Sequence, residues 1–127
     1  MSMKKIMPAV ALPALTFVVL NALSALPAAA KGTDVFAAEC AECHSVKEGK
    51  NKKGPSLFAV LGRKAGTIAD FKYSDPMKDS GIGWTREKLQ AYIAAPKRAV
   101  PGGKMKYDGL DNATEMNELL DYLGTLK

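Results

Sequence analysis

The sequence contains few of the residues that build metal sites or disulfide bonds. Its 127 residues include only two cysteines and one histidine. A structural zinc site needs four ligands from Cys, His or carboxylate side chains, and Cys43 and His44 are adjacent. Two cysteines can form at most one disulfide bond, and such a bond would leave the neighbouring histidine unexplained. The composition therefore excludes a disulfide-rich scaffold and argues against a zinc domain.

Other patterns are missing as well. No segment alternates apolar and polar residues as a half-buried strand does, so we predict an all-α fold. The formal net charge is only +5 and no expected helix has a continuous basic face, which argues against nucleic-acid binding. No serine–histidine or paired-carboxylate arrangement is recognisable, which excludes hydrolytic catalysis of the common kinds.

The first thirty residues have the form of a secretory signal peptide. Lys4 and Lys5 precede an apolar run from residue 9 to 20, and three small residues, 28–30, provide a cleavage site. Pro13 interrupts the run, which is shorter than the roughly 20 residues of a membrane span. We therefore expect residues 1–30 to be cleaved and the protein to be periplasmic; an uncleaved anchor helix is the alternative.

Residues 31–127 then form one domain of 97 residues. The 18 basic residues include Lys4 and Lys5, so this domain has 16 basic and 13 acidic residues, a net charge of +3. A chain this short buries only about 60–65% of its unfolded surface. A large apolar cofactor would supply core volume that the chain itself lacks.

The segment from Cys40 to His44 carries the most specific motif in the sequence. It reads C-x-x-C-H, the spacing for covalent attachment of a c-type haem. Each thiol can form a thioether with one haem vinyl group, and the histidine can ligate the iron. A thioredoxin-like C-x-x-C motif would need a preceding strand and a parallel sheet, and neither is recognisable.

Three main helices joined by long loops are expected. They begin at Thr33, Thr85 and Asn112, whose side chains can accept hydrogen bonds from free backbone N–H groups. The first helix should carry the cysteine motif on one stripe, the second ends at Pro96, and a short helix is expected after Ser74 or Asp75. Apolar positions at helical spacing mark the inner faces of the second and third helices: Leu89, Tyr92 and Ile93, then Met116, Leu119, Leu120 and Leu123.

A second axial ligand must come from another residue type, because the chain has one histidine. Methionine is the natural candidate in a c-type cytochrome. Met116 lies on the apolar face of the last helix, where packing explains it. Met105 lies between two lysines in a loop rich in Pro and Gly, so it ranks above Met77, which follows Asp75-Pro76. Lys, Tyr, Asn and water remain alternatives at this stage.

Several segments, in this order, resemble the class I cytochromes c of the mitochondrial and bacterial cytochrome c2 type. They are CAECHSV, GPSLFAVLGRKAG, FKYSDPMKDSGIGW, YIAAPKRAVPGGKM and LLDYLGTLK. The resemblance implies a small single-haem fold, with long loops wrapped around one covalently bound haem c. It also implies that Gly32 and Phe36 of the first helix pack against Leu119 and Tyr122 of the last.

The resemblance assigns roles to individual residues. Cys40 and Cys43 would hold the haem, and His44 and Met105 would ligate the iron from opposite sides. Pro55 would accept a hydrogen bond from the second ring nitrogen of His44, which fixes the orientation of the imidazole.

Four further residues are assigned to the haem surroundings. Arg63, Tyr73 and Trp84 resemble the group that encloses a buried haem propionate, a carboxylate that needs donors and positive charge in a core. Tyr92 resembles the buried tyrosine that donates a hydrogen bond to the methionine sulfur.

The sequence departs from the family pattern in two ways. Met77 stands where the family usually has an asparagine beside an internal water, so we expect an altered polar network and redox potential. Glu39 and Asp111 are acidic where the mitochondrial form has lysine. The basic ring around the haem edge is therefore only partly present, in Lys52, Lys53, Lys97, Arg98 and Lys104.

The expected function is electron transfer and not catalysis. The resemblance implies a soluble, monomeric carrier that moves single electrons between redox proteins of a respiratory, photosynthetic or dehydrogenase chain, with partners that present acidic docking patches. No stable membrane insertion is expected after cleavage. The alternatives are a membrane-anchored or complex-bound haem subunit, and a haem peroxidase or gas-binding protein if Met105 is not a ligand.

Overall fold

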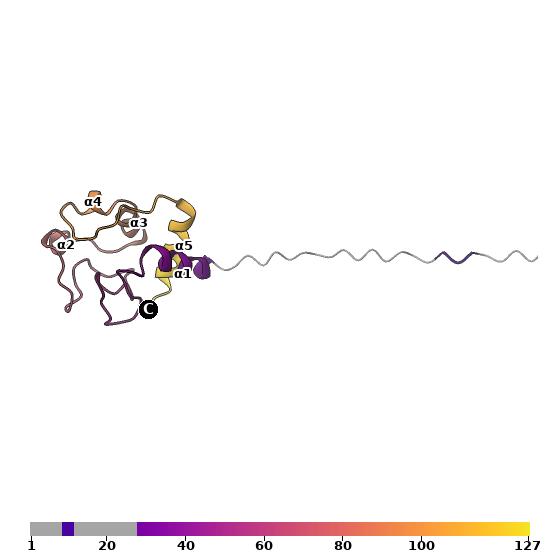
Figure 1. Ribbon diagram of the computed structural model, residues 1–127, viewed down its shortest axis with the longest axis horizontal. Helices are drawn as coiled ribbons and strands as arrows, with labels where there is room; N and C mark the ends of the chain where they lie inside the picture. The colour runs from indigo at the N-terminus through magenta and orange to yellow at the C-terminus, as the bar shows by residue number, and fades with distance from the viewer. Residues whose placement is uncertain (1–8, 12–27) are drawn as a thin grey trace, which may run out of the picture.

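The computed structural model describes residues 9–11 and 28–127, and within them the secondary structure is helical (Figure 1). The helices are α1 (Ala28–Glu39), α2 (Asp75–Asp79), α3 (Arg86–Ala94), α4 (Pro96–Ala99) and α5 (Ala113–Gly124). Among the described residues there is no strand, only one isolated bridge between Lys64 and Gly83. The all-α prediction is confirmed, with α1, α3 and α5 as the main helices and long loops between them.

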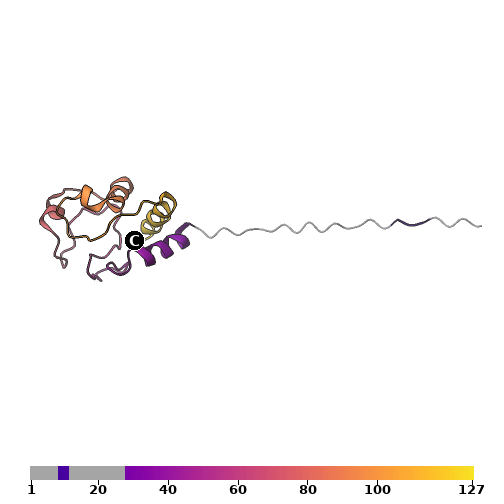
Figure 2. The same cartoon turned by 45° about the horizontal axis from the view of Figure 1, so that its top comes forward.

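The first and last helices pack against each other. Figures 1 and 2 both show α1 and α5 side by side. At Gly32, a Cβ atom would lie only 2.5 Å from the Cβ of Tyr122, so the two backbones approach more closely than a larger residue allows. The rings of Phe36 and Tyr122 meet edge to face, with centroids 5.9 Å apart. The packing of α1 on α5 expected from the resemblance is confirmed.

Helix α5 begins after Asn112, as predicted from the sequence. The Asn112 side chain accepts hydrogen bonds from the backbone N–H groups of Thr114 and Glu115, at 3.0 and 3.1 Å. These bonds satisfy two of the donors that the first turn of a helix leaves free. The predicted apolar face is buried in the core: Met116, Leu119, Leu120 and Leu123.

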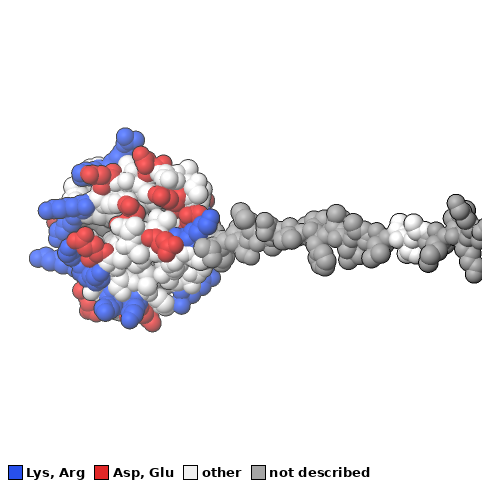
Figure 3. Space-filling model, turned by 45° about the vertical axis from the view of Figure 1, so that its right-hand side comes forward, with Lys and Arg blue, Asp and Glu red and all other residues white. Residues whose placement is uncertain are grey.

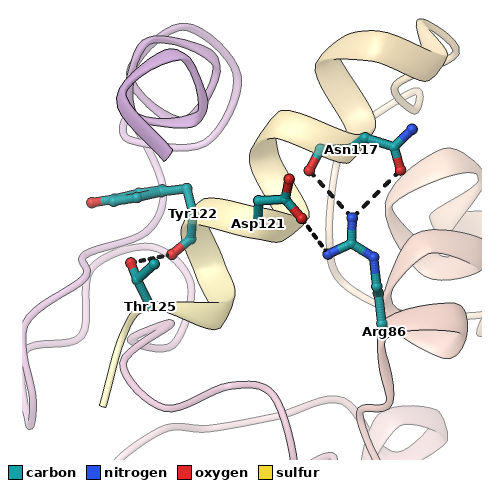
Figure 4. Close-up of polar contacts among 5 residues, drawn as sticks. All are labelled: Arg86, Asn117, Asp121, Tyr122 and Thr125. Carbon is teal, nitrogen blue, oxygen red and sulfur yellow. Dashed lines mark hydrogen bonds and ion pairs between the residues drawn. The ribbon is translucent and has the colours of Figure 1, made fainter. Parts of the chain in front are cut away.

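Helix α3 is capped at Thr85, as predicted, by a hydrogen bond from Lys88 N–H to the threonine hydroxyl. Its first residue, Arg86, reaches across to α5 (Figure 4). The guanidinium forms an ion pair of 2.8 Å with Asp121 and hydrogen bonds of 3.4 Å with the backbone and side-chain oxygens of Asn117. This contact joins the two helices at the surface.

Other helix boundaries differ from the sequence prediction. The prediction that α1 begins at Thr33 is wrong, because the helix already includes Ala28. Alanine has the highest helix propensity, and three alanines extend the helix upstream. Pro96 does end α3, but it also begins the short helix α4 in a segment expected to be loop; proline suits the first turn of a helix. Helix α2 forms after Ser74 as predicted.

The predicted signal peptide lies almost entirely outside the described residues. Its expected cleavage position, after Ala30, falls within α1. In the described part of the chain, no helix has the length and apolar character needed to cross a bilayer.

Candidate functional site

The C-x-x-C-H motif lies in a turn directly after α1. The helix ends at Glu39, so the prediction that the motif continues the helical stripe is wrong. The Cys40 N–H still donates to the Phe36 carbonyl at 2.9 Å, as in a helix. The Cys40 carbonyl then accepts from the N–H groups of Cys43, at 3.1 Å, and His44, at 2.9 Å. These bonds fold the motif into one turn, which carries both cysteine side chains and the imidazole.

The loop of residues 50–57 holds this turn in place. The Gly54 N–H donates to the Cys43 carbonyl at 2.8 Å, and the Lys53 ammonium pairs with the Glu42 carboxylate at 2.6 Å. The backbone contact does not depend on side chains, so it fixes the path of the motif even where the exposed ion pair contributes little.

His44 is oriented through its second ring nitrogen. Nδ1 lies 2.7 Å from the Pro55 carbonyl oxygen, the contact that the resemblance implies. A carbonyl can only accept, so Nδ1 carries the proton and Nε2 keeps its lone pair. Burial lowers the pKa of His44, although the Pro55 contact opposes this, and the nearby charges of Lys52 and Arg63 lower it further. The neutral imidazole that results is the form that binds a metal.

The two cysteines are partly buried thiols, with no disulfide between them. Burial, with smaller effects from the charges of Glu39 and Cys43, raises the pKa of the Cys40 thiol to about 11. The thiol is therefore protonated near neutral pH. Oxidation to a disulfide proceeds through the thiolate, so this environment disfavours it.

Met105 lies on an extended segment after α4. The Gly103 N–H donates to the Val100 carbonyl at 3.1 Å, which turns the chain before the methionine. The Met105 side chain is partly buried against the core, and it lines the same small pocket as Tyr92. The Tyr92 hydroxyl makes no hydrogen bond to any residue in the described part of the chain. The structure thus brings Tyr92 and Met105 together.

Arg63 is a half-buried structural cation and not a free surface charge. Its guanidinium donates to the carbonyl oxygens of Phe58 and Ser56, both at 2.9 Å. Burial lowers the pKa of Arg63, and the proximity of Tyr73 partly offsets this effect. The backbone N–H of Trp84 donates to the Arg63 carbonyl at 2.9 Å. The three residues assigned to the propionate group therefore do lie near one another.

Trp84 is buried, and its ring lies 5.1 Å from that of Tyr92. The Tyr73 hydroxyl accepts a long hydrogen bond of 3.4 Å from the Ile68 N–H. The aromatic pair links the group around Arg63 to the pocket that Met105 lines.

One contact at the site was missed at the level of sequence. The Tyr107 hydroxyl donates to the Glu39 carboxylate at 2.6 Å, across 68 residues. Burial and the Glu39 charge raise the pKa of Tyr107, so the phenol stays protonated and continues to donate. No local signal marks such a pair, because its members belong to segments far apart in the sequence.

The surface around the site carries both signs of charge. Figure 3 shows Lys and Arg side chains interspersed with Asp and Glu on the face in view. Two residues of the basic ring expected around the haem edge form ion pairs: Lys53 pairs with Glu42, and Lys97 pairs with Asp108 at 3.3 Å. Part of the basic ring is therefore neutralised locally.

These side chains match the donor set that a haem c requires. The cysteines present two thiols in one turn, His44 presents a neutral imidazole with Nε2 unprotonated, and Met105 offers a thioether on a separate segment. Thiols attach the macrocycle, while imidazole and thioether are ligands that cytochromes use on iron.

The sequence is similar to known proteins of one family. The sequence profile of the family described as "Cytochrome c" matches residues 29–127. Cytochrome c2 iso-2 of Magnetospirillum molischianum is 51% identical over 88 residues, which cover 69% of this chain and 91% of the relative. The protein of the same name from Magnetospirillum fulvum is 49% identical over 87 residues, 68% and 91% of the two chains. Cytochrome c of Gibberella zeae is 43% identical over 94 residues, 73% and 89% of the two chains.

Proposed function

This chain belongs to the cytochrome c family, and we propose that it is a soluble, periplasmic member of that family. As a member it binds haem c covalently through two cysteines and is an electron carrier, not an enzyme. In the proposed function it shuttles single electrons between redox proteins of a respiratory, photosynthetic or dehydrogenase chain. The observation that carries the proposal is the turn in which Cys40, Cys43 and His44 follow one another, with His44 Nδ1 bound to Pro55.

The chain's own residues would perform distinct tasks. The haem, when bound, supplies a reversible change between Fe(III) and Fe(II). Cys40 and Cys43 would attach it, and Pro55, which binds His44 Nδ1, would leave Nε2 free to hold the metal. The Met105 thioether would favour Fe(II) over Fe(III) and so raise the reduction potential.

The surrounding residues would tune this centre. Tyr92 has a hydroxyl without a partner in the described part of the chain and lies at the pocket of Met105, which suits donation to the sulfur. Arg63, Tyr73 and Trp84 lie near one another and would enclose a propionate with positive charge and hydrogen-bond donors. His44 and Met105 would both hold the iron, so no position would be left open to an external ligand.

The periplasmic location rests on the form of residues 1–30, with their basic start, apolar run and small residues before Lys31. The relatives named cytochrome c2 are bacterial proteins, and this agrees with export. Partners with acidic patches would approach the exposed basic residues Arg98 and Lys104 in fast encounters that weaken with salt.

The test is expression in a bacterial host that matures c-type cytochromes, followed by mass measurement and spectroscopy. We expect a periplasmic, monomeric product of residues 31–127 plus one haem. The ferric protein should show the weak near-infrared band of sulfur–iron ligation, and Met105→Ala should abolish this band. A colourless product would contradict the proposal.

Two other outcomes would favour other functions. Carbon monoxide binding by the reduced wild-type protein at neutral pH would indicate an open sixth position, as in a peroxidase or gas-binding protein. A product that retains residues 1–30 and fractionates with membranes would indicate an anchored subunit.

A further inference from the structure

The segment that carries Met105 has few ties to the rest of the protein. It is bounded by backbone hydrogen bonds of 3.1 Å, from Gly103 to Val100 and from Leu110 to Ile93. Between these points, in the part of the chain that the structure describes, residues 104–109 form no backbone hydrogen bond. Their position therefore depends on side-chain contacts.

Two polar side-chain contacts hold this segment, and they differ in character. The Lys97–Asp108 pair has a separation of 3.3 Å, and both side chains are largely exposed, at 75% and 100%. Such a pair contributes little and is weakened by salt. The Tyr107–Glu39 hydrogen bond is shorter, at 2.6 Å, and the tyrosine ring packs against the core. Because its ring is packed, the tyrosine has less freedom than the exposed lysine, so this contact constrains the segment more than the Lys97–Asp108 pair does.

The Tyr107–Glu39 bond also joins the two parts of the site. Glu39 directly precedes Cys40, and Tyr107 follows Met105 by two residues. One hydrogen bond therefore connects the segment that would supply the thioether to the segment that attaches the haem.

We propose that Tyr107 and Glu39 are positioning residues, whose hydrogen bond holds the Met105 segment closed so that the thioether stays on the iron. This inference rests on the proposed ligation by Met105. Breaking the hydrogen bond should shift the segment toward an open arrangement in which the thioether has left. An external neutral ligand such as imidazole can then take its place; the exchange replaces one neutral donor by another and transfers no electron.

The test measures imidazole binding to the ferric holoprotein by loss of the near-infrared band. Tyr107→Phe keeps the packed ring and removes only the donor, while Glu39→Gln removes the charged acceptor. Each variant should bind imidazole more tightly than the wild type, Tyr107→Phe by about tenfold, the worth of a partly exposed hydrogen bond to a carboxylate. The double variant should gain little beyond the stronger single variant, because both changes remove the same bond.

The matched control is Tyr122→Phe. Tyr122 packs between α1 and α5, and its hydroxyl forms no hydrogen bond within the described residues. Its imidazole affinity should equal that of the wild type. Denaturation of each holoprotein provides a second measurement. If only the Met105 segment loosens, the imidazole affinity should change while the unfolding midpoint stays close to that of the wild type.

The outcomes separate this inference from the proposed function. If the wild-type protein lacks the near-infrared band, Met105 is not the ligand and the proposed function fails at that point. If the band is present but Tyr107→Phe binds imidazole as weakly as Tyr122→Phe and the wild type, the positioning role alone is refuted. Additive effects of the two single substitutions would equally refute it.

Discussion

The imidazole of His44 lies directly against the backbone of Gly54. A Cβ atom on residue 54 would lie 2.8 Å from Nδ1 and 2.9 Å from Nε2 of the ring, and closer still to Cε1. The same loop supplies the Gly54 N–H that binds the Cys43 carbonyl and the Pro55 carbonyl that binds the ring. The absence of a side chain at position 54 is therefore a condition for the observed orientation of His44.

Gly54→Ala should displace the imidazole. The ring cannot retreat without losing its contact with Pro55, so we expect a smaller yield of low-spin holoprotein and a loss of stability of about 1–3 kcal/mol. Visible spectra and urea denaturation of the purified holoprotein measure both effects. Gly83→Ala is the control, because a Cβ atom there meets no atom within 4 Å. Equal behaviour of the two variants would contradict the steric role of Gly54.

Met77 lies at a buried position, with 8% of the residue exposed, where the resemblance implies an asparagine. Met77→Asn introduces a polar amide into this environment, which should favour the more highly charged Fe(III) state and lower the reduction potential. Loss of apolar volume and burial of the amide should also reduce stability by about 2 kcal/mol or more.

Redox titration and denaturation of the holoprotein measure the two effects of Met77→Asn. Met77→Leu is the matched control, since it conserves volume without adding polarity and should cost less than about 1.5 kcal/mol. An unchanged potential in Met77→Asn would show that this position does not influence the centre.

Local signals in the sequence predicted most of the helices. Thr85 and Asn112 cap helices as expected, because a cap needs only hydrogen bonds to backbone groups two or three residues ahead. Ser74, one of the two expected starts of the short helix, caps α2 in the same way. The start of α1 was mispredicted because Thr33 looks like a cap while the preceding alanines continue the helix. At Thr33 the upstream alanines therefore outweigh the capping signal.

Sequence motifs indicate only those parts of the candidate site that lie within one segment or match a known pattern. The C-x-x-C-H spacing indicates the attachment residues, and the resemblance implies the His44–Pro55 contact that the structure contains. The carbonyl partners of Arg63 and the bond between Tyr107 and Glu39 depend on how distant segments meet. Periodicity and spacing describe residues within one segment, so they carry no information on such pairs.

Helices α1 and α5 approach closely at Gly32, where a Cβ atom would lie 2.5 Å from the Cβ of Tyr122. Gly32→Ala should push the helices apart and lower the free energy of unfolding by about 1–3 kcal/mol, despite the higher helix propensity of alanine. Gly124→Ala in α5 is the control, because its Cβ atom would lie at an ordinary 3.4 Å from Leu61. Urea denaturation should show that Gly124→Ala is neutral or stabilising; a similar gain from Gly32→Ala would refute the close contact.

Ala59 is the one non-glycine residue in the described ranges with a positive φ, at 50°. Its N–H donates to the Leu126 carbonyl at 3.0 Å, which ties this strained turn to the C-terminal segment. A residue with a Cβ atom pays about 1–2 kcal/mol for this left-handed conformation. Glycine adopts it freely, although its greater freedom in the unfolded chain costs about 0.4–1 kcal/mol.

Ala59→Gly should therefore raise the stability of the holoprotein by about 0.5–1 kcal/mol, since the relief of strain exceeds the added entropy of the unfolded chain. Ala69→Gly, at an exposed turn position without positive φ, is the matched control and should lose about 0.4–1 kcal/mol. Urea denaturation of both variants gives the sign directly. If both lose stability to the same extent, the left-handed conformation at Ala59 costs nothing.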